Sequence, residues 1–329
     1  MSKIFITGGM GYIGTHLAKQ AIKAGHEVML YDSLIYEQDY KKMLGEINGA
    51  KFVVGDIRNT FLLDKCLEDF KPDYVCHFSD FASVYAANHN PRLTEENNYT
   101  ACMTALRMYE DRGIKVLYNS SSSVYGTQQI DKEMTEEDEL PAPTDLYVKY
   151  KLLMEEYIKN RPNLKIIVFR PATIFGVAPR LRIDLLSNHF TYMAIAKGKI
   201  GVFDGTAHRA CLDIDELSQM YLKVIERGKW DSLIYNLGHH NMTKFEYAQG
   251  IQNVIPCSLD RSSDITDPRN LQIDCSKFNK EFGFEYFKTY EQSIKEVAEW
   301  IEENLETITK NDFIGILTMP QAEWNRMCN

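Results

Sequence analysis

The sequence predicts an α/β fold in which a parallel sheet carries helices on both faces. Short apolar runs indicate buried strands, helical periodicity separates these runs, and the links between them are short. Strands are expected at 3–7, 27–31, 51–54, 74–78, 115–119 and 166–170, and helices at 12–24, 60–70, 91–112 and 144–159. This alternation of strand and helix favours a doubly wound topology with right-handed crossovers.

The first 32 residues carry the strongest motif. The strand 3–7 runs directly into a glycine-rich segment, which then opens a helix. Gly8 allows a tight turn, Gly11 lets the backbone approach a pyrophosphate, and Gly14 lets the helix pack closely on the strand. The amides and positive dipole end of the helix then face the phosphates. This context predicts a Rossmann-type dinucleotide-binding unit rather than a surface turn.

An acidic residue ends the second strand. Asp32 follows Gly14 by eighteen residues. A carboxylate at this point accepts hydrogen bonds from the hydroxyls of an adenosine ribose and repels a 2'-phosphate. The expected cofactor is therefore NAD rather than NADP.

The second half of the chain changes in character after Pro171. Loops lengthen, and short strands at 200–203 and 233–237 alternate with helices at 214–227, 244–254 and 290–305. At 329 residues, the chain exceeds the usual size of one domain. We expect an NAD-binding domain over 1–170 that includes the catalytic residues. A smaller C-terminal α/β domain, mainly for substrate binding, is expected over 171–329, with some of its segments returning to the first domain.

Composition restricts the partners and the compartment. The net charge of −9 argues against nucleic acid or an anionic membrane as a partner, so a phosphorylated substrate needs a local group of arginines. The seven cysteines are dispersed without a Cys-x-x-Cys pair, which favours free thiols over disulfides or a metal site. Without an apolar run of eighteen residues, and with a core strand at the start, a cytoplasmic location is expected.

A tyrosine and a lysine provide the candidate chemistry. Tyr147 and Lys151 are four residues apart on an expected helix, so their side chains share one face. An ammonium beside a phenol favours the phenolate and lowers the pKa of the tyrosine, which makes Tyr147 a candidate general acid and base. The hydroxyls of 120–123 follow a strand and are expected at the same carboxyl edge of the sheet.

Four motifs in order resemble one known family. They are Thr-Gly-Gly-Met-Gly-Tyr-Ile-Gly at 7–14, Gly-Asp at 55–56, Ser-Ser-Ser-Ser-Val-Tyr-Gly at 120–126 and Tyr-Val-Lys-Tyr-Lys at 147–151. Together they are similar to the extended short-chain dehydrogenase/reductases that act on nucleotide sugars, and the resemblance extends to about residue 304. It implies that Ser121 hydrogen-bonds a sugar hydroxyl, that Tyr147 removes its proton, and that Lys151 also holds the nicotinamide ribose.

The resemblance also assigns further cofactor contacts. Besides the glycines, Asp32, Tyr147 and Lys151, the implied contacts are Tyr12, Ile13, Asp56, Ile57 and Asn98. Asp56 and Ile57 are expected beside the adenine, and Asn98 behind the serine loop. One departure stands out, because the usual His-Leu-Ala-Ala is replaced here by 77–80, with Asp80 at its end. His77 is expected to be a packed residue at a strand end.

The expected substrate is a nucleotide-diphosphate sugar. Arginines suit phosphate because the planar guanidinium makes paired, charge-assisted hydrogen bonds. Arg209 and Arg269 match family positions that hold the diphosphate, and Thr173 stands where 4-epimerases commonly carry asparagine. The expected substrate contacts are Ser83, Ser122, Thr173, Arg180, Arg182, Asn188, Arg209 and Arg269. No metal ligand set is expected.

The resemblance narrows the reaction but leaves alternatives. Dehydratases of the family carry an Asp-Glu pair where this chain has Ser122 and Ser123, and Asp32 disfavours a reductase that consumes NADPH. Oxidation at C4 remains, as the first half of a 4-epimerisation or as a net dehydrogenation. Segments 170–186 and 267–270 are most similar to C4 dehydrogenases of GDP-heptose in capsular polysaccharide biosynthesis. The alternatives are a UDP-glucose 4-epimerase-like enzyme and, more remotely, a non-catalytic NAD-binding regulator.

The family also implies a homodimer. The helices 91–112 and 144–159 commonly form a four-helix interface, and the first of them offers Tyr99, Met103, Leu106 and Met108 as apolar surface. These side chains could instead face the protein's own sheet. The apolar tail 311–329 has no assigned place.

Overall fold

The structure is a computed structural model, and it describes residues 1–36, 39–126, 132–227, 230, 234–262 and 270–308. Its centre is a seven-stranded, fully parallel sheet with the strand order β11-β7-β5-β4-β1-β2-β3. The strands are β1 (Lys3–Thr7), β2 (Glu27–Asp32), β3 (Lys51–Val54), β4 (Tyr74–His77), β5 (Lys115–Asn119), β7 (Ile166–Pro171) and β11 (Ile234–Leu237). The expected doubly wound sheet is confirmed, and the strand order reverses between β1 and β4.

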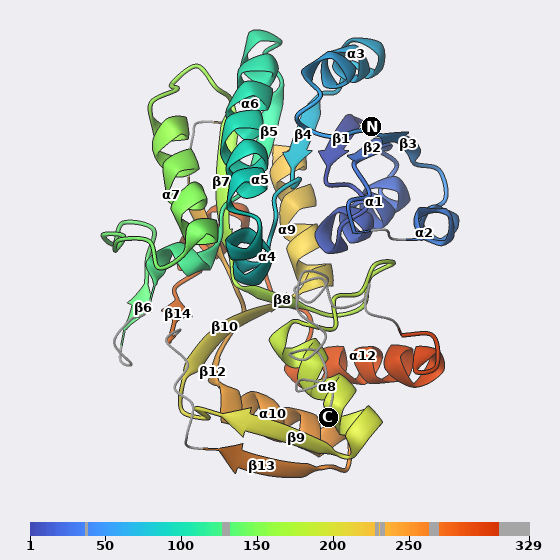
Figure 1. Ribbon diagram of the computed structural model, residues 1–329, viewed down its shortest axis with the longest axis vertical. Coiled ribbons are helices and arrows are strands. Elements are labelled where there is room, and N and C mark those ends of the chain that lie inside the picture. The colour runs from blue at the N-terminus through green and yellow to red at the C-terminus, as the bar shows by residue number, and fades with distance from the viewer. Residues whose placement is uncertain (37–38, 127–131, 228–229, 231–233, 263–269, 309–329) are drawn as a thin grey trace.

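Helices cover both faces of this sheet (Figure 1). One face packs on α1 (Tyr12–Lys23) and α9 (Ile214–Arg227), through side chains such as Ile4 and Ile6 of β1. The other face packs on α3 (Thr60–Phe70), α6 (Cys102–Asp111) and α7 (Leu146–Lys159), through Phe5. Alternate residues of one strand thus enter two separate cores, as a sheet buried on both sides requires.

The second half of the chain contributes to two places. β11 forms an edge of the central sheet beside β7, and α9 packs on α1, so both belong to the same layers as the first half. The remaining part holds β8 (Thr173–Phe175), β10 (His208–Asp213) and β12 (His240–Thr243) in one sheet, and β9 (Lys199–Phe203) with β13 (Ser258–Ser262) in another. A separate core joins β9 to α8 (Leu186–Lys197), α10 (Lys244–Val254) and α12 (Tyr290–Asn304).

Short elements connect these layers. They are α2 (Tyr40–Ile47), α4 (Val84–His89), the 3-10 turn η2 (Ser122–Tyr125), α11 (Ser276–Phe282), and the paired strands β6 (Glu133–Met134) and β14 (Gln272–Ile273). The helices α2, α4, α8 and α11 were not expected from the sequence. Each of the first two begins at a side-chain cap, since Asp39 accepts from Lys42 N–H and Ser83 accepts from Ala86 N–H.

The expected long helix 91–112 is interrupted. It consists of α5 (Pro91–Glu95), a π-helical segment η1 (Glu96–Ala101) and α6. Within it, Leu106 is buried in the protein's own core and Tyr99 stacks on Tyr150 of α7 at 6.0 Å between ring centroids. The dimer across these helices stays a prediction. Leu106 is not part of the apolar surface expected for it, because this side chain is buried in the protein's own core. The tail 311–329 lies outside the described residues.

Candidate active site

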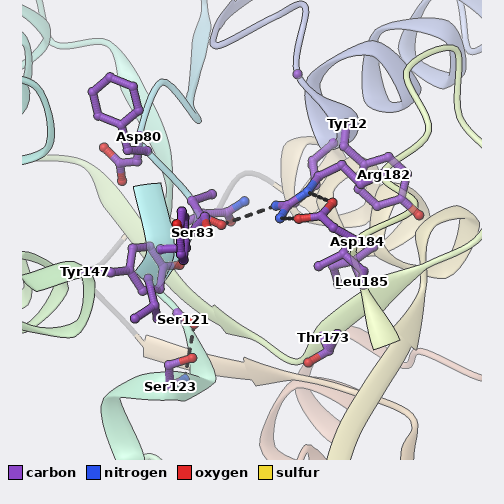
Figure 2. Close-up of a pocket in the computed structure, with 18 of the residues that line it drawn as sticks. Tyr12, Asp80, Ser83, Ser121, Ser123, Tyr147, Thr173, Arg182, Asp184 and Leu185 are labelled. Carbon is purple, nitrogen blue, oxygen red and sulfur yellow. Dashed lines mark hydrogen bonds and ion pairs between the residues drawn. The ribbon is translucent and has the colours of Figure 1, made fainter. Parts of the chain in front are cut away.

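A large cavity of about 1500 Å³ opens at the carboxyl edge of the central sheet. Its wall includes the segments that follow β1 and β4, on either side of the reversal in strand order, where α/β sheets bind their ligands. Figure 2 shows Ser121, Ser123 and Tyr147 on one side of the cavity, with Tyr12, Arg182 and Asp184 on the other. The volume exceeds what one drug-sized ligand needs, so a cofactor and a substrate fit together.

The glycine-rich turn has the geometry of a phosphate cradle. Gly8 adopts a φ of +66°, and a Cβ there would lie 2.4 Å from the carbonyl oxygen of Phe78. A Cβ on Gly14 would lie 2.5 Å from the carbonyl oxygen of Gly8, so the helix can approach the strand only because this residue is glycine. Gly8, Gly11 and Gly14 all line the cavity, together with Ile13. These residues fit the expected dinucleotide.

Asp32 lies beside this turn at the end of β2. Its carboxylate accepts hydrogen bonds from Met10 N–H at 3.0 Å and Leu34 N–H at 2.8 Å, and it lines the cavity. Burial raises the pKa of Asp32, although the two amides and Arg180 act in the opposite direction. Its contact with a ribose stays a prediction.

Tyr12, Asp56 and Ile57 also line the cavity. The hydroxyl of Tyr12 donates to the Gly176 carbonyl at 2.6 Å, which joins the first turn of α1 to the loop after β8. Asp56 and Ile57 follow β3, as expected, and the carboxylate of Asp56 pairs with Arg58 at 2.7 Å. The hydrogen bonds from Arg58 hold the pKa of Asp56 below its usual value.

The catalytic candidates project from α7. Asp145 caps the helix by accepting from Val148 N–H at 3.0 Å, so α7 begins at Leu146, two residues later than expected. Tyr147 and Lys151 both line the cavity, and the Lys151 ammonium lies 5.7 Å from the centre of the Tyr147 ring. The expected shared face is confirmed.

A buried ion pair fixes the same helix face one turn further on. Glu155 accepts from Arg170 Nη2 at 2.6 Å and from Nε at 3.1 Å, and it also accepts from the Ser120 hydroxyl at 2.5 Å. Arg170, on β7, donates in addition to the Tyr125 hydroxyl at 2.9 Å. Glu155 therefore ties α7 to both the serine loop and the sheet.

The serine loop carries Ser121 into the cavity. The Ser121 hydroxyl oxygen accepts from Ser123 N–H at 3.1 Å and caps η2, which leaves its own proton available for donation. Ser122 is buried and lines the cavity as well, and so does Ser83 on the segment after β4. The hydroxyl of Ser121 thus lies in the cavity that Tyr147 and Lys151 also line.

Asp80 is the main functional candidate whose contact the sequence did not reveal. Its carboxylate pairs with the Lys151 ammonium, which also donates to the Asn119 carbonyl. Both side chains are buried, with 4% of Lys151 and 5% of Asp80 exposed. Burial acts to lower the pKa of Lys151, but Asp80 and Tyr147 outweigh it, and the pKa is raised.

Asn98 has a different place from the one expected. It is buried outside the cavity wall, where it accepts from Phe81 N–H at 2.9 Å and donates to the Phe81 carbonyl at 3.3 Å. Its neighbour Asn97 lines the cavity and donates to the Ser79 carbonyl at 2.7 Å. The pair holds the segment that carries Asp80, and the contact of Asn98 with the cofactor stays a prediction.

Arg182, Thr173 and Arg209 all line the cavity, as expected of substrate contacts. Arg182 pairs with Asp184 at 2.7 Å and donates to the Ala82 carbonyl at 3.2 Å, which links the two walls (Figure 2). Arg209 is buried on β10 and donates to the His208 carbonyl at 2.7 Å. Their contacts with substrate stay predictions.

Arg180 and Asn188 lie differently from the expectation. Arg180 donates to the Met10 carbonyl at 3.4 Å and packs over Tyr36, so it lines the cofactor side of the cavity. Asn188 is fully buried outside the wall, accepting from Gly176 N–H and donating to the Arg182 carbonyl. It holds the loop that presents Arg182, and its contact with substrate stays a prediction. Arg269 lies outside the described residues.

His77 is a packed residue, as expected. Its ring is fully buried between Tyr109 and Tyr118, and Nδ1 lies 3.3 Å from the Thr7 hydroxyl. Burial lowers its pKa to about 4, so the imidazole is neutral at neutral pH.

Sequence comparison decides the family. A family model described as the NAD dependent epimerase/dehydratase family matches residues 4–238, which is more than half of the chain. The chain belongs to this family. The expected resemblance, the NAD cofactor and the enzymatic class are thereby confirmed, and the glycine cradle and Asp32 fit that cofactor.

Several relatives cover most of the chain. A UDP-glucose 4-epimerase from Lactobacillus helveticus is 26% identical over 311 residues, covering 86% of this chain and 91% of that protein. Protein CapI from Staphylococcus aureus is 28% identical over 280 residues, covering 76% and 83%. Among solved structures, a UDP-glucose-4-epimerase from Stenotrophomonas maltophila with bound NAD has a TM-score of 0.83 at 20% identity, covering 94% and 100%.

A second solved structure has a different activity on the same fold. The dTDP-glucose 4,6-dehydratase DesIV from Streptomyces venezuelae, with NAD bound, has a TM-score of 0.83 at 22% identity, covering 94% of this chain and 99% of that one. Fold similarity at this level does not choose the reaction. In the described part of the chain, no helix is long and apolar enough to cross a membrane.

Proposed function

We propose that this protein is an NAD-dependent nucleotide-sugar 4-epimerase. It oxidises the C4 hydroxyl of a nucleotide-diphosphate sugar and then reduces the 4-keto sugar on its other face. The observation that carries the proposal is the meeting of Ser121, Tyr147 and Lys151 in one cavity that is large enough for two ligands. The sequence relatives with this activity favour the epimerase over the net dehydrogenase that segment 170–186 suggested.

The groups around Ser121 argue against dehydration. Elimination of water from a sugar needs an acid and a base beside the reacting carbons. In this chain the two positions after Ser121 are serines, and Ser122 lines the cavity as a neutral hydroxyl. A hydroxyl can donate a hydrogen bond to the sugar but does not supply the carboxylate that elimination needs.

Each catalytic residue has a defined task. Bound NAD supplies the hydride acceptor. Tyr147 removes the proton from the C4 hydroxyl, helped by the positive charge of Lys151, whose ammonium is 5.7 Å from the ring centre. Ser121 donates a hydrogen bond to the same sugar oxygen, because its hydroxyl oxygen accepts from Ser123 N–H while its proton is left for donation. Tyr147 then returns the proton when the keto oxygen is reduced.

A net C4 dehydrogenase, with GDP-heptose as substrate, is the second candidate. Besides segment 170–186, one contact favours it. Arg182 donates to the Ala82 carbonyl and pairs with Asp184, which forms a bridge between two segments of the cavity wall. Epimerisation needs the keto sugar to turn between two hydride transfers, and this bridge restricts that movement.

The experiment incubates purified protein with NAD and, in parallel, with UDP-glucose, UDP-galactose or GDP-heptose. Reduced nicotinamide is followed by absorbance and the sugar product by NMR. Epimerised sugar without net reduced nicotinamide supports the epimerase. Stoichiometric reduced nicotinamide with a 4-keto product supports the second candidate and refutes the first.

Variants test whether the turnover belongs to this site. Tyr147→Phe should fold and bind NAD, with turnover lowered by at least about a hundredfold, the usual contribution of a general acid and base. Tyr157→Phe is the matched control, because Tyr157 lies on the same helix but bonds to Arg107 at 3.0 Å, away from the cavity. Wild-type turnover in Tyr147→Phe would refute the assignment.

A further inference from the structure

Asp80 is a buried carboxylate in direct contact with the catalytic lysine, and its position is one where the family usually has an apolar residue. We propose that Asp80 is a positioning residue that sets the pH at which Tyr147 ionises, by neutralising the charge of Lys151. The proposal rests on the acid and base role of Tyr147 given above. Its test needs no sugar nucleotide, so a wrong substrate assignment leaves it intact.

The contact is specific and is held from behind. Asp80 Oδ2 accepts from Lys151 Nζ, and the same ammonium donates to the Asn119 carbonyl. The Asp80 segment is fixed by Asn97, which donates to the Ser79 carbonyl at 2.7 Å, and by Asn98, which accepts from Phe81 N–H at 2.9 Å. Asp80 is therefore placed by its own scaffold, independently of the ion pair.

The other titratable groups around Lys151 and Tyr147 do not compete with Asp80. Three of them are neutral at neutral pH, because burial lowers the pKa of His77 to about 4 and raises the pKa values of Cys102 and Tyr118 far above their usual range. Two nearby charges are already paired, Glu155 with Arg170 at 2.6 Å and Arg182 with Asp184 at 2.7 Å. Asp80 is thus the carboxylate that acts on Lys151 among the described residues.

The second oxygen of Asp80 separates this arrangement from an ion pair that only stabilises the fold. Oδ1 is buried and accepts no hydrogen bond from the described residues, although it belongs to a residue that lines the cavity. A buried ion pair stabilises the fold only if its remaining lone pairs are satisfied. Among the described residues, Oδ1 of Asp80 has no such hydrogen bond. We therefore assign to Asp80 an electrostatic effect on Lys151 rather than a role in stabilising the fold.

The sign of the effect follows from simple electrostatics. A positive lysine next to a phenol lowers the pKa of the phenol, and a negative carboxylate next to the lysine opposes this. Asp80 therefore keeps Tyr147 protonated to a higher pH than Lys151 alone would allow. Removing the charge of Asp80 should allow Tyr147 to ionise at lower pH.

The test is a phenolate titration of Asp80→Asn, which keeps the shape of the side chain and an acceptor oxygen for Lys151. Ultraviolet absorbance is followed against pH, with NAD at saturation and without substrate. Subtracting the same curve for a matched protein carrying Tyr147→Phe isolates one tyrosine out of nineteen. The midpoint of Tyr147 should fall by about one pH unit or more in Asp80→Asn.

Two further variants make the result specific. Asp80→Glu keeps the charge, so its midpoint should stay within about half a unit of wild type. Asp64→Asn removes an exposed acid that pairs with Arg112 on the outer surface, and it should not move the midpoint.

The proposal is overturned by an unchanged midpoint in Asp80→Asn, which would make Asp80 a structural partner of Lys151. An upward shift also overturns it, because that result would mean that Asp80 mainly keeps the proton on Lys151. Loss of thermal stability alone, with no change in the midpoint, counts as the first of these outcomes.

Discussion

The Glu155–Arg170 pair offers a sharp test of how the site is held. Glu155→Gln keeps one acceptor oxygen but replaces the other, which accepts from Arg170 Nη2 at 2.6 Å, with an amide that presents hydrogens to the guanidinium. Arg170 is only 3% exposed and keeps just its bond to the Tyr125 hydroxyl and one bond to residue 155. The substitution therefore leaves a buried charge without its counter-charge.

The expected cost follows from these contacts. One charge-assisted hydrogen bond contributes about 1.5–3 kcal/mol, and breaking a buried pair by removal of one partner costs about 3–5 kcal/mol in total. The unfolding entropy of a 329-residue chain is about 0.7 kcal/mol per kelvin near its midpoint. Glu155→Gln should therefore lower the unfolding midpoint by about 4–7 °C.

Urea unfolding followed by circular dichroism measures the free energy, and thermal unfolding gives the midpoint. Glu156→Gln is the matched control, because Glu156 is the exposed neighbour on α7 and contacts only Asn160 among the described residues, so its cost should stay within about 0.5 kcal/mol. Arg170→Met should lower the free energy of unfolding less in the Glu155→Gln background than in the wild type. If Glu155→Gln lowers the free energy of unfolding by less than about 1 kcal/mol, the Glu155–Arg170 pair does not anchor the helix and the reasoning is refuted.

Two further predictions concern cofactor choice and pH. Asp32→Asn should weaken the binding of NAD about tenfold and reduce the preference for NAD over NADP, because the variant lacks the charge that repels a 2'-phosphate. Calorimetry with both cofactors measures the two affinities, and an unchanged ratio of these affinities would contradict the prediction. Burial raises the pKa of Asp213 from 3.8 to about 6, against the effect of Lys288, so its contribution to stability is complete below pH 3.8 and is lost as pH rises through 6. Relative to Asp213→Asn, the free energy of unfolding of the wild type should fall by about 3 kcal/mol between pH 3.8 and 8. Urea unfolding at both ends of that range measures the difference, and a constant difference would mean that Asp213 is ionised throughout.

The first half of the fold could be predicted closely because its signals are local. The strand 51–54 and the helix 60–70 have the bounds expected of them, since a short apolar run and a capping Asn59 define them without distant partners. The helix α8 escaped prediction because it packs against α10, α12 and β9, so its apolar residues do not form one stripe. The break in the helix 91–112 also depends on distant residues, because Asn97 and Asn98 bond to a segment about eighteen residues earlier.

The site shows the same limit. Tyr147 and Lys151 were predictable because four residues on a helix bring side chains together. The contact between Asp80 and Lys151 spans 71 residues. It forms because β4 and β5 are parallel neighbours, and because Lys151 of α7 also donates to the Asn119 carbonyl at the end of β5. The sequence marked Asp80 as a departure from the family pattern, but it could not supply the partner. Arg180 differs for a related reason, because the loop after β8 turns it towards Met10.

The place of β11 limits how the protein can be divided for experiments. A fragment ending at residue 170 would leave β7 as an open strand edge, with unpaired backbone groups that invite association. It would also remove Asn236, which accepts from the Tyr125 hydroxyl at 2.8 Å, and Ser218, whose hydroxyl contacts His16 of α1 at 2.8 Å. A soluble cofactor-binding fragment must therefore extend at least to Leu237, and a chimera that exchanges substrate-binding segments must keep α9 and β11 with the first half of the chain.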